Sequence, residues 1–278
     1  MTYYISSAQF TAQDDLVPGP AGWSEPLYNY GLAYSLAGHD KIIGKGSSSG
    51  YESTGLFNNY DAILDTGSGK DTITGAAWSD YWGPSIYNLG SIETGNDEDY
   101  ISTYGTFSSF NNTTYYGALE NYGMVSLGDG NDTLDAKVNV NYQPNESAIW
   151  NWGTIEAGNG DDMILSNTAI YNEGFINTGN GNDTIITFTT YGGFDGSGNV
   201  FLGEGEDYLV GFGNGDYHGG NGQDSLLLPS GYYTIGIGGS ADVSFAGNGK
   251  VMRTFGFEKL LNGAHDFTSF YDGQTIFV

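Results

Sequence analysis

The chain has 278 residues, no cysteine and 46 glycines, and 38% of its residues are apolar. Thirty-three acidic residues against seven basic ones give a formal net charge of −26. This charge excludes binding to nucleic acid and opposes binding to anionic membranes, while the absence of cysteine excludes disulfides and thiol chemistry. Because no stretch approaches about 18 consecutive apolar residues, we also expect no membrane span.

The first 26 residues contain Pro18, Pro20 and Pro26 and precede the repeats, so residues 1–26 are expected to form an N-terminal cap. The opening MTYYISSAQF has neither a basic segment nor an apolar one, so no ordinary signal peptide is expected.

From Leu27 onward a strand pattern recurs, (I/L)-x-N-x-G-x-(I/V)-x-x-G, in which apolar residues alternate on either side of an Asn-x-Gly bend. Alternation of this kind predicts a strand with one face in a core. The asparagines of the clearest copies should share one corner and form a ladder of side-chain amides. The clear copies are 86–95, 119–128, 149–158 and 170–179, with weaker ones at 27–42 and 56–67, and the ladder asparagines are Asn88, Asn121, Asn151 and Asn172.

A second motif follows each strand pattern, G-x-G-x-D-x-(I/L). Glycines let the backbone turn through positive φ, and the aspartate adds a hard anionic oxygen, which is the ligand type that Ca²⁺ prefers. The copies are 66–73, 127–134, 157–164, 178–185, 202–209 and 219–226, and a seventh, 94–101, has Asp97 in place of the second glycine.

The aspartates of these turns lie 17 to 33 residues apart, which is the spacing of a stacked repeat architecture. Helix signals are few, so the fold class is expected to be all-β: a right-handed parallel β-helix or β-roll solenoid of about eight coils, with capping ends. Each repeat should contain three short strands, and the tighter repeats between Leu202 and Leu227 should approach a two-strand roll. The repeats are expected to span 27–228.

The turns resemble the nonapeptide repeats of the RTX (hemolysin-type calcium-binding repeat) family, G-G-x-G-x-D-x-U-x with U a large apolar residue. Residues 219–227 match every position and 202–210 miss only the first glycine. The resemblance implies several Ca²⁺ ions held between stacked turns by aspartate carboxylates and backbone carbonyls, in a bacterial protein exported by type I secretion. The expected metal-site residues are Gly67, Gly69, Asp71, Gly95, Asp97, Asp99, Gly128, Gly130, Asp132, Gly158, Gly160, Asp162, Gly179, Gly181, Asp183, Gly203, Gly205, Asp207, Asp216, Gly220, Gly222 and Asp224.

The chain departs from the RTX pattern because single turns recur once per repeat until Leu202, instead of nonapeptides running back to back. We therefore expect one calcium column along one edge, ending at Asp224, and partial unfolding without calcium. The alternative interpretation is that the turns are ordinary Asx-type turns that close a solenoid.

Residues 229–278 lack the repeats and should form a C-terminal cap. The ending DFTSFYDGQTIFV is compatible with a type I secretion signal or with a final edge strand.

These features predict a secreted, extracellular, calcium-binding protein with a structural or adhesive role. The alternative is a Ca²⁺-dependent polysaccharide lyase or glycoside hydrolase on the same scaffold, although no catalytic residues can be assigned and an enzyme is the less favoured class. Aromatic segments at 78–83, 113–117 and 150–153 could stack against carbohydrate, so sugars or cell-surface components are the expected partners.

Overall fold

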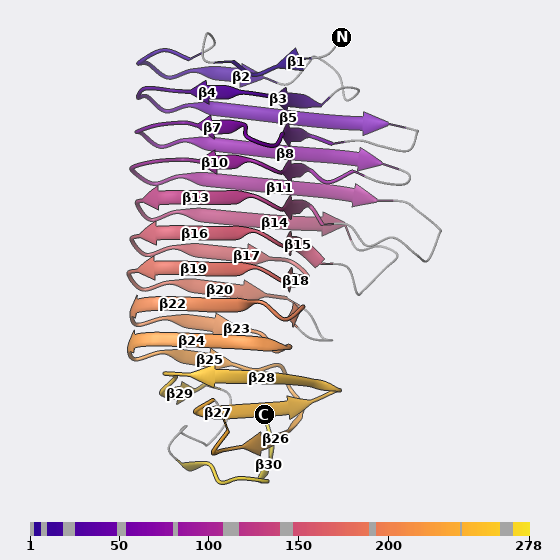
Figure 1. Ribbon diagram of the computed structural model, residues 1–278, viewed down its shortest axis with the longest axis vertical. Coiled ribbons are helices and arrows are strands. Elements are labelled where there is room, and N and C mark those ends of the chain that lie inside the picture. The colour runs from indigo at the N-terminus through magenta and orange to yellow at the C-terminus, as the bar shows by residue number, and fades with distance from the viewer. Residues whose placement is uncertain are drawn as a thin grey trace.

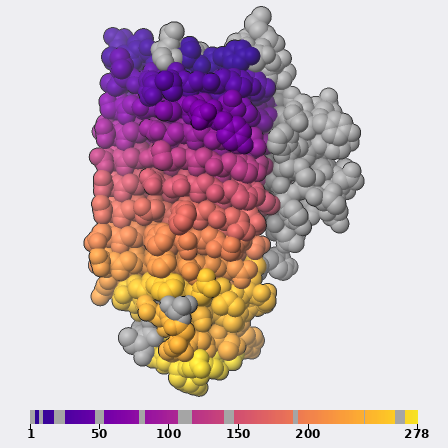
Figure 2. Space-filling view, in the orientation of Figure 1, coloured from indigo at the N-terminus to yellow at the C-terminus, as the bar shows by residue number. Residues whose placement is uncertain are grey.

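The computed structural model describes residues 3–6, 10–18, 26–48, 54–79, 83–107, 117–139, 147–188, 193–239, 241–261 and 269–278. These residues contain no α-helix, and their strands stack along one long axis in three sheets (Figure 1). The all-β prediction is confirmed, and the arrangement is solenoid-like. In Figure 2 the colour bands follow the chain from one end to the other, because each repeat stacks on the one before it.

Sheet A has eight parallel strands, and all but the first and the last end at the asparagine of the bend. Its strands in spatial order are β1 (Tyr3–Tyr4), β3 (Leu27–Asn29), β6 (Leu56–Asn58), β9 (Ile86–Asn88), β12 (Leu119–Asn121), β15 (Ser147–Asn151), β18 (Ala169–Asn172) and β21 (Phe194–Asp195).

Sheet B has ten parallel strands, most of which begin directly after the aspartate of a G-x-G-x-D turn. They are β2 (Leu16–Pro18), β5 (Lys41–Ser48), β8 (Thr72–Ser79), β11 (Tyr100–Phe107), β14 (Thr133–Asn139), β17 (Met163–Ser166), β20 (Thr184–Thr187), β23 (Tyr208–Val210), β25 (Ser225–Leu227) and β29 (Lys259–Leu260).

Sheet C lies between the Asn-x-Gly bend and the glycine-rich turn of each repeat. Nine of its twelve strands are parallel: β4 (Leu32–Tyr34), β7 (Ile63–Asp65), β10 (Ser91–Glu93), β13 (Met124–Asp129), β16 (Thr154–Asn159), β19 (Phe175–Asn180), β22 (Asn199–Gly205), β24 (Gly215–Gly222) and β28 (Lys250–Phe255). The sheet then continues antiparallel through β27 (Val243–Gly247), β26 (Tyr232–Gly236) and β30 (Thr275–Phe277).

Two features of the ends agree with the sequence patterns. Sheet A stops at β21, so the segment from Leu202 to Leu227 places its strands in sheets B and C alone. The change from parallel to antiparallel pairing falls within residues 229–278, where the repeats are absent. There Phe257 and Leu260 are buried at the C-terminal end of the stack.

The core consists of columns of apolar side chains, one per repeat, that the strand register aligns. On sheet A the column is Leu27, Leu56, Ile86, Leu119, Ile149, Ile170 and Phe194, and on sheet B it includes Ile42, Ile73, Ile101, Leu134, Ile164, Ile185, Leu209 and Leu226, all at most 1% exposed. Burying each such side chain contributes about 1.5–3 kcal/mol.

A buried ladder of asparagine amides runs down the corner between sheets A and C, as the sequence predicts. Each Nδ2 donates to the Oδ1 of the asparagine in the next repeat, at 2.7 or 2.8 Å, and also to a backbone carbonyl of sheet C. The ladder contains Asn29, Asn58, Asn88, Asn121, Asn151 and Asn172, so it includes the asparagines of the two weaker copies.

Replacing Asn151 with alanine should lower the free energy of unfolding by about 2–4 kcal/mol, because it leaves buried donors and acceptors on both sides without partners. Asn151 donates to Asn172 Oδ1 at 2.8 Å and to the Phe175 carbonyl at 3.0 Å, and it accepts from Asn121 at 2.8 Å. Urea unfolding measures the change. The matched control is Asn177→Ala, since Asn177 is exposed on sheet C and should change stability by less than about 0.5 kcal/mol. Equal losses in both variants would contradict the ladder.

Candidate functional site

The aspartates of the glycine-rich turns form one buried file along the edge between sheets C and B. The backbone N–H of each aspartate donates to Oδ1 of the aspartate in the next repeat, over distances from 2.7 Å for Asp71 to Asp99 to 3.0 Å for Asp207 to Asp224. We call Asp71, Asp99, Asp132, Asp162, Asp183, Asp207 and Asp224 the aspartate file; each is at most 3% exposed. The sequence-predicted carboxylates are therefore brought together.

The file is longer than the sequence predicts at both ends. Asp40 accepts from the Asp15 N–H at 2.8 Å and donates its own N–H to Asp71 Oδ1 at 2.7 Å. At the other end the Asp224 N–H donates to Glu258 Oε2 at 2.7 Å, so the row of carboxylates does not end at Asp224. Both additions carry a weak form of the motif, G-x-D-x-I at 38–42 and G-x-E-x-L at 256–260, which could have revealed them.

The glycines of the turns stand in two columns, and at every one of them except Gly67 the neighbouring backbone leaves no room for a Cβ. A Cβ on Gly158 would lie 1.7 Å from the Gly128 carbonyl oxygen, and one on Gly160 would lie 1.6 Å from that of Gly130. In the second column Asp97 occupies a glycine position with φ of 82°, the left-handed region that disfavours other residues. The first column is Gly67, Gly95, Gly128, Gly158, Gly179, Gly203 and Gly220, and the second is Gly69, Asp97, Gly130, Gly160, Gly181, Gly205 and Gly222.

Asp216 is the one predicted metal-site residue that lies apart from the turns. It is on strand β24 in register with Asn199 and Arg253, and its carboxylate forms an ion pair with Arg253 on the outer face of sheet C.

The second oxygen of every carboxylate in the file is buried and reaches no hydrogen-bond partner among the described residues. Burial, which disfavours the charged form, raises the pKa of Asp99 to about 8 and those of Asp162 and Asp207 to about 7. It also raises the pKa of Asp71, Asp132 and Asp224 to about 6 and that of Asp183 above its usual value. Neighbouring carboxylates add to the effect at Asp99, where both Asp71 and Asp132 disfavour ionisation.

Calcium between the turns fits this arrangement poorly. Adjacent turns are joined directly, for example by the Gly160 N–H to the Asn180 carbonyl at 2.7 Å and the Thr184 N–H to the Asp162 carbonyl at 2.8 Å. Because Oδ1 of each file carboxylate already accepts a backbone N–H, each aspartate has only Oδ2 free for an ion, whereas calcium takes roughly six to eight oxygen ligands. Among the described residues no three acidic or histidine side chains gather in a way that could hold a metal. Calcium binding therefore stays a prediction from the resemblance.

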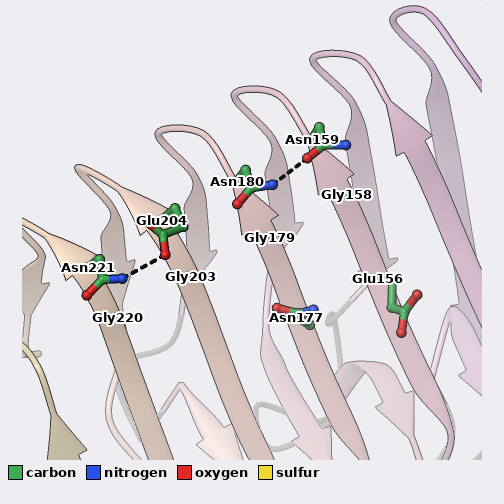
Figure 3. A pocket seen from close by; sticks show the side chains of 10 residues that line it. All are labelled: Glu156, Gly158, Asn159, Asn177, Gly179, Asn180, Gly203, Glu204, Gly220 and Asn221. Carbon is green, nitrogen blue, oxygen red and sulfur yellow. Dashed lines mark hydrogen bonds between the residues drawn. The ribbon is translucent and has the colours of Figure 1, made fainter.

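A shallow groove of about 660 Å³ runs beside the turns across β16, β19, β22 and β24 (Figure 3). The glycine column forms its floor, and its outer wall is a ladder in which Asn180 Nδ2 donates to Asn159 Oδ1 at 2.5 Å and Asn221 Nδ2 to Glu204 Oε1 at 2.7 Å. Glu156 stands on the opposite side of the groove, two repeats from Glu204 in the strand register. Two repeats correspond to roughly 10 Å along the axis alone, so these carboxylates do not converge on one bond.

Comparisons with protein-family models, with curated proteins and with solved structures yield no match for this chain. The resemblance to the RTX family thus depends on the turn motifs themselves. The described residues include no helix with the length and apolar character that a membrane span requires.

Proposed function

We propose that this chain is an extracellular, non-enzymatic β-helix with a structural or adhesive role. In this proposal the stack is a right-handed solenoid of about eight coils, the hand that parallel strand connections adopt in nearly all cases. The observation that carries the proposal is the continuous register of all three sheets, reinforced by two internal ladders, the asparagine ladder and the aspartate file.

Such an arrangement supports a structural role because every repeat is held to its neighbours by both backbone and side-chain hydrogen bonds. Each repeat of a solenoid contacts only its neighbours, so ladders that run through all of them make the stack resist local opening. The extracellular location is supported by composition alone: the lack of cysteine and the charge of −26 suit an acidic exported protein.

The enzyme alternative needs two carboxylates converging beside aromatic side chains. The groove of Figure 3 keeps Glu156 and Glu204 apart, and the file carboxylates are buried and bonded to backbone amides. Neither arrangement supplies an acid and a base facing one substrate bond, which favours the non-enzymatic role.

Two measurements test the proposal. Incubation with a panel of plant, algal and bacterial polysaccharides should release no reducing ends and no unsaturated products. Hydrogen exchange should be uniformly slow over β6 to β25, since a structural stack opens as a unit. Cleavage of any polysaccharide, or rapid exchange in the central repeats, would overturn the proposed role.

A further inference from the structure

An unbroken strip of aromatic side chains covers the outer face of sheet A. In most repeats the residue before the ladder asparagine is aromatic and points outward, and the strand register aligns these residues. We call the following residues the aromatic strip: Tyr4, Tyr28, Tyr30, Phe57, Tyr60, Tyr87, Tyr122, Trp150, Trp152 and Tyr171. Of the aromatic segments expected to meet carbohydrate, 150–153 contributes to the strip, whereas half of 78–83 and most of 113–117 lie outside the described residues.

Between the first repeats of the strip the rings meet at an angle, although Tyr28 stacks on Tyr30 within one repeat and Tyr122 stacks on Trp152 further along, which covers one face of Tyr122. Tyr28 and Phe57 lie 5.7 Å apart at 58°, and Phe57 and Tyr87 lie 5.6 Å apart at 38°, so the rings are tilted rather than stacked. Tyr30 and Tyr60 are 54% and 66% exposed. Exposed apolar patches that continue over several elements mark binding surfaces more often than isolated exposed residues do.

One residue of the aligned column is not aromatic: Glu120, which is in register with Tyr87 on one side and Trp150 on the other. It faces outward but is only 5% exposed, and its Oε1 reaches no hydrogen-bond partner among the described residues. A buried carboxyl with an unused oxygen in the middle of an aromatic surface needs a partner to offset its lost hydration.

The centre of the strip is uncharged at neutral pH. Burial raises the pKa of Glu120 to about 8, and burial together with the nearby Glu120 raises the pKa of Tyr122 to about 12 and that of Tyr87 above its usual value. Strands β1, β3, β6, β9, β12, β15 and β18 contain no lysine or arginine. The centre of the strip thus offers aromatic rings and phenol hydroxyls, whereas exposed carboxylates lie at its C-terminal end, where Glu173 accepts the Tyr171 O–H at 2.9 Å and Asp195 is in register with Tyr171.

We propose that the aromatic strip binds a neutral glycan that lies along the axis of the stack, centred on the exposed Tyr60 and Tyr122. A glycan presents C–H faces that pack on rings and hydroxyls that exchange hydrogen bonds with phenols. An anionic polymer or a second copy of the chain would bring like charge against a net charge of −26. A cationic peptide would be drawn to the exposed carboxylates of Glu173 and Asp195 at the end of the strip and not to its centre, where the one carboxyl, Glu120, is buried. The inference rests on the adhesive role proposed above and names its partner.

Native gel electrophoresis through hydroxyethylcellulose, dextran and polygalacturonate tests the inference with the intact chain. The wild-type protein should be retarded by a neutral polymer and not by polygalacturonate. Tyr60→Ala and Tyr122→Ala should each weaken binding about fivefold, the effect of losing one aromatic contact. Glu120→Gln removes the one carboxyl of the aligned column, and it should bind a neutral polymer as wild type does because Glu120 is buried. The matched control is Tyr271→Ala, which removes an exposed tyrosine far from sheet A and should change nothing.

Four outcomes would overturn the inference. These are no retardation by either neutral polymer, equal weakening in the Tyr271→Ala control, binding to oligolysine that Glu120→Gln abolishes, and a dimer in sedimentation velocity that Tyr60→Ala dissociates. In each case the structural role still stands. Release of reducing ends from a bound polymer would instead overturn the proposed function, so the two failures can be told apart. Circular dichroism of each variant verifies that the fold is retained.

Discussion

Replacing Gly158 with alanine should destabilise the chain by more than about 4 kcal/mol, or prevent folding altogether. The new Cβ would lie 1.7 Å from the Gly128 carbonyl oxygen, which is part of the stacked backbone and cannot move aside. The φ of Gly158, +118°, adds strain because side chains rarely adopt that conformation. The urea midpoint, or the yield of folded protein by circular dichroism, measures the effect.

Two glycines of the Asn-x-Gly bends, Gly153 and Gly31, form a matched pair that separates the effect of close packing between repeats from the effect of backbone strain. A Cβ on Gly153 would lie 2.0 Å from the Gly123 carbonyl oxygen, whereas Gly31, in the same motif at the N-terminal end of the stack, has no atom within 4 Å. We therefore expect Gly153→Ala to cost several kcal/mol and Gly31→Ala less than about 0.5 kcal/mol. Similar stabilities for the two variants would show that the glycines are not required for the close approach of repeats.

The fold could be predicted from the sequence because its period is explicit. Alternation on either side of Asn151 predicts two strands and a bend, and the structure has β15 and β16 on either side of that asparagine. The ladder also follows, since an asparagine that recurs at one position must stack on its own copies. These inferences need only the chemistry of one repeat and the rule that repeats are stacked.

The role of the turn glycines could not be predicted in the same way. Positive φ, close approach of another backbone and presentation of carbonyls to a metal all favour glycine, and a sequence does not separate them. The structure separates them at Gly160, where φ is +133° and the Gly130 carbonyl oxygen occupies the space of a side chain. The close approach of the neighbouring repeat is therefore enough to explain why residue 160 is a glycine, and no bound ion is needed to explain it. The burial of Glu120 could not be predicted for a related reason: its surroundings are formed by aromatic residues of other repeats.

The aspartate file makes stability depend on pH, and the sign follows from the direction of the pKa shifts. The pKa of Asp99 rises from 3.8 to about 8 on folding, so the folded state holds this proton more tightly than the unfolded chain does. Its contribution to stability is complete below about pH 4 and is lost as pH rises to about 8. A shift of this size corresponds to about 5 kcal/mol, or a fall in Tm of roughly 10 °C. Thermal melting from pH 4 to pH 9 measures the fall.

Asp99→Asn should make that profile shallower by the share of Asp99, because an amide oxygen can still accept the Asp71 N–H but cannot ionise, while the other file carboxylates still titrate. The asparagine ladder of the same molecule shows that stacked amides suit such a position. The control is Glu206→Gln, which removes the same charge from an exposed turn residue and should leave the profile unchanged. If Asp99→Asn melts with the wild-type profile, the file carboxylates do not control the pH dependence.

Thermal melting with and without a chelator shows whether protons or calcium ions neutralise the carboxylates of the aspartate file. With protons, the Tm at pH 8 should be the same in EGTA as in millimolar calcium, and Asp99→Asn should be at least as stable as wild type at that pH. If calcium is shared between turns, EGTA should lower the Tm at pH 8, because it removes the stabilisation that bound calcium adds to the folded state. Asp99→Asn should then lack the stabilisation from calcium at its own turn whether or not EGTA is present. Because neighbouring turns already bond directly and leave each carboxylate a single free oxygen, we expect the first result.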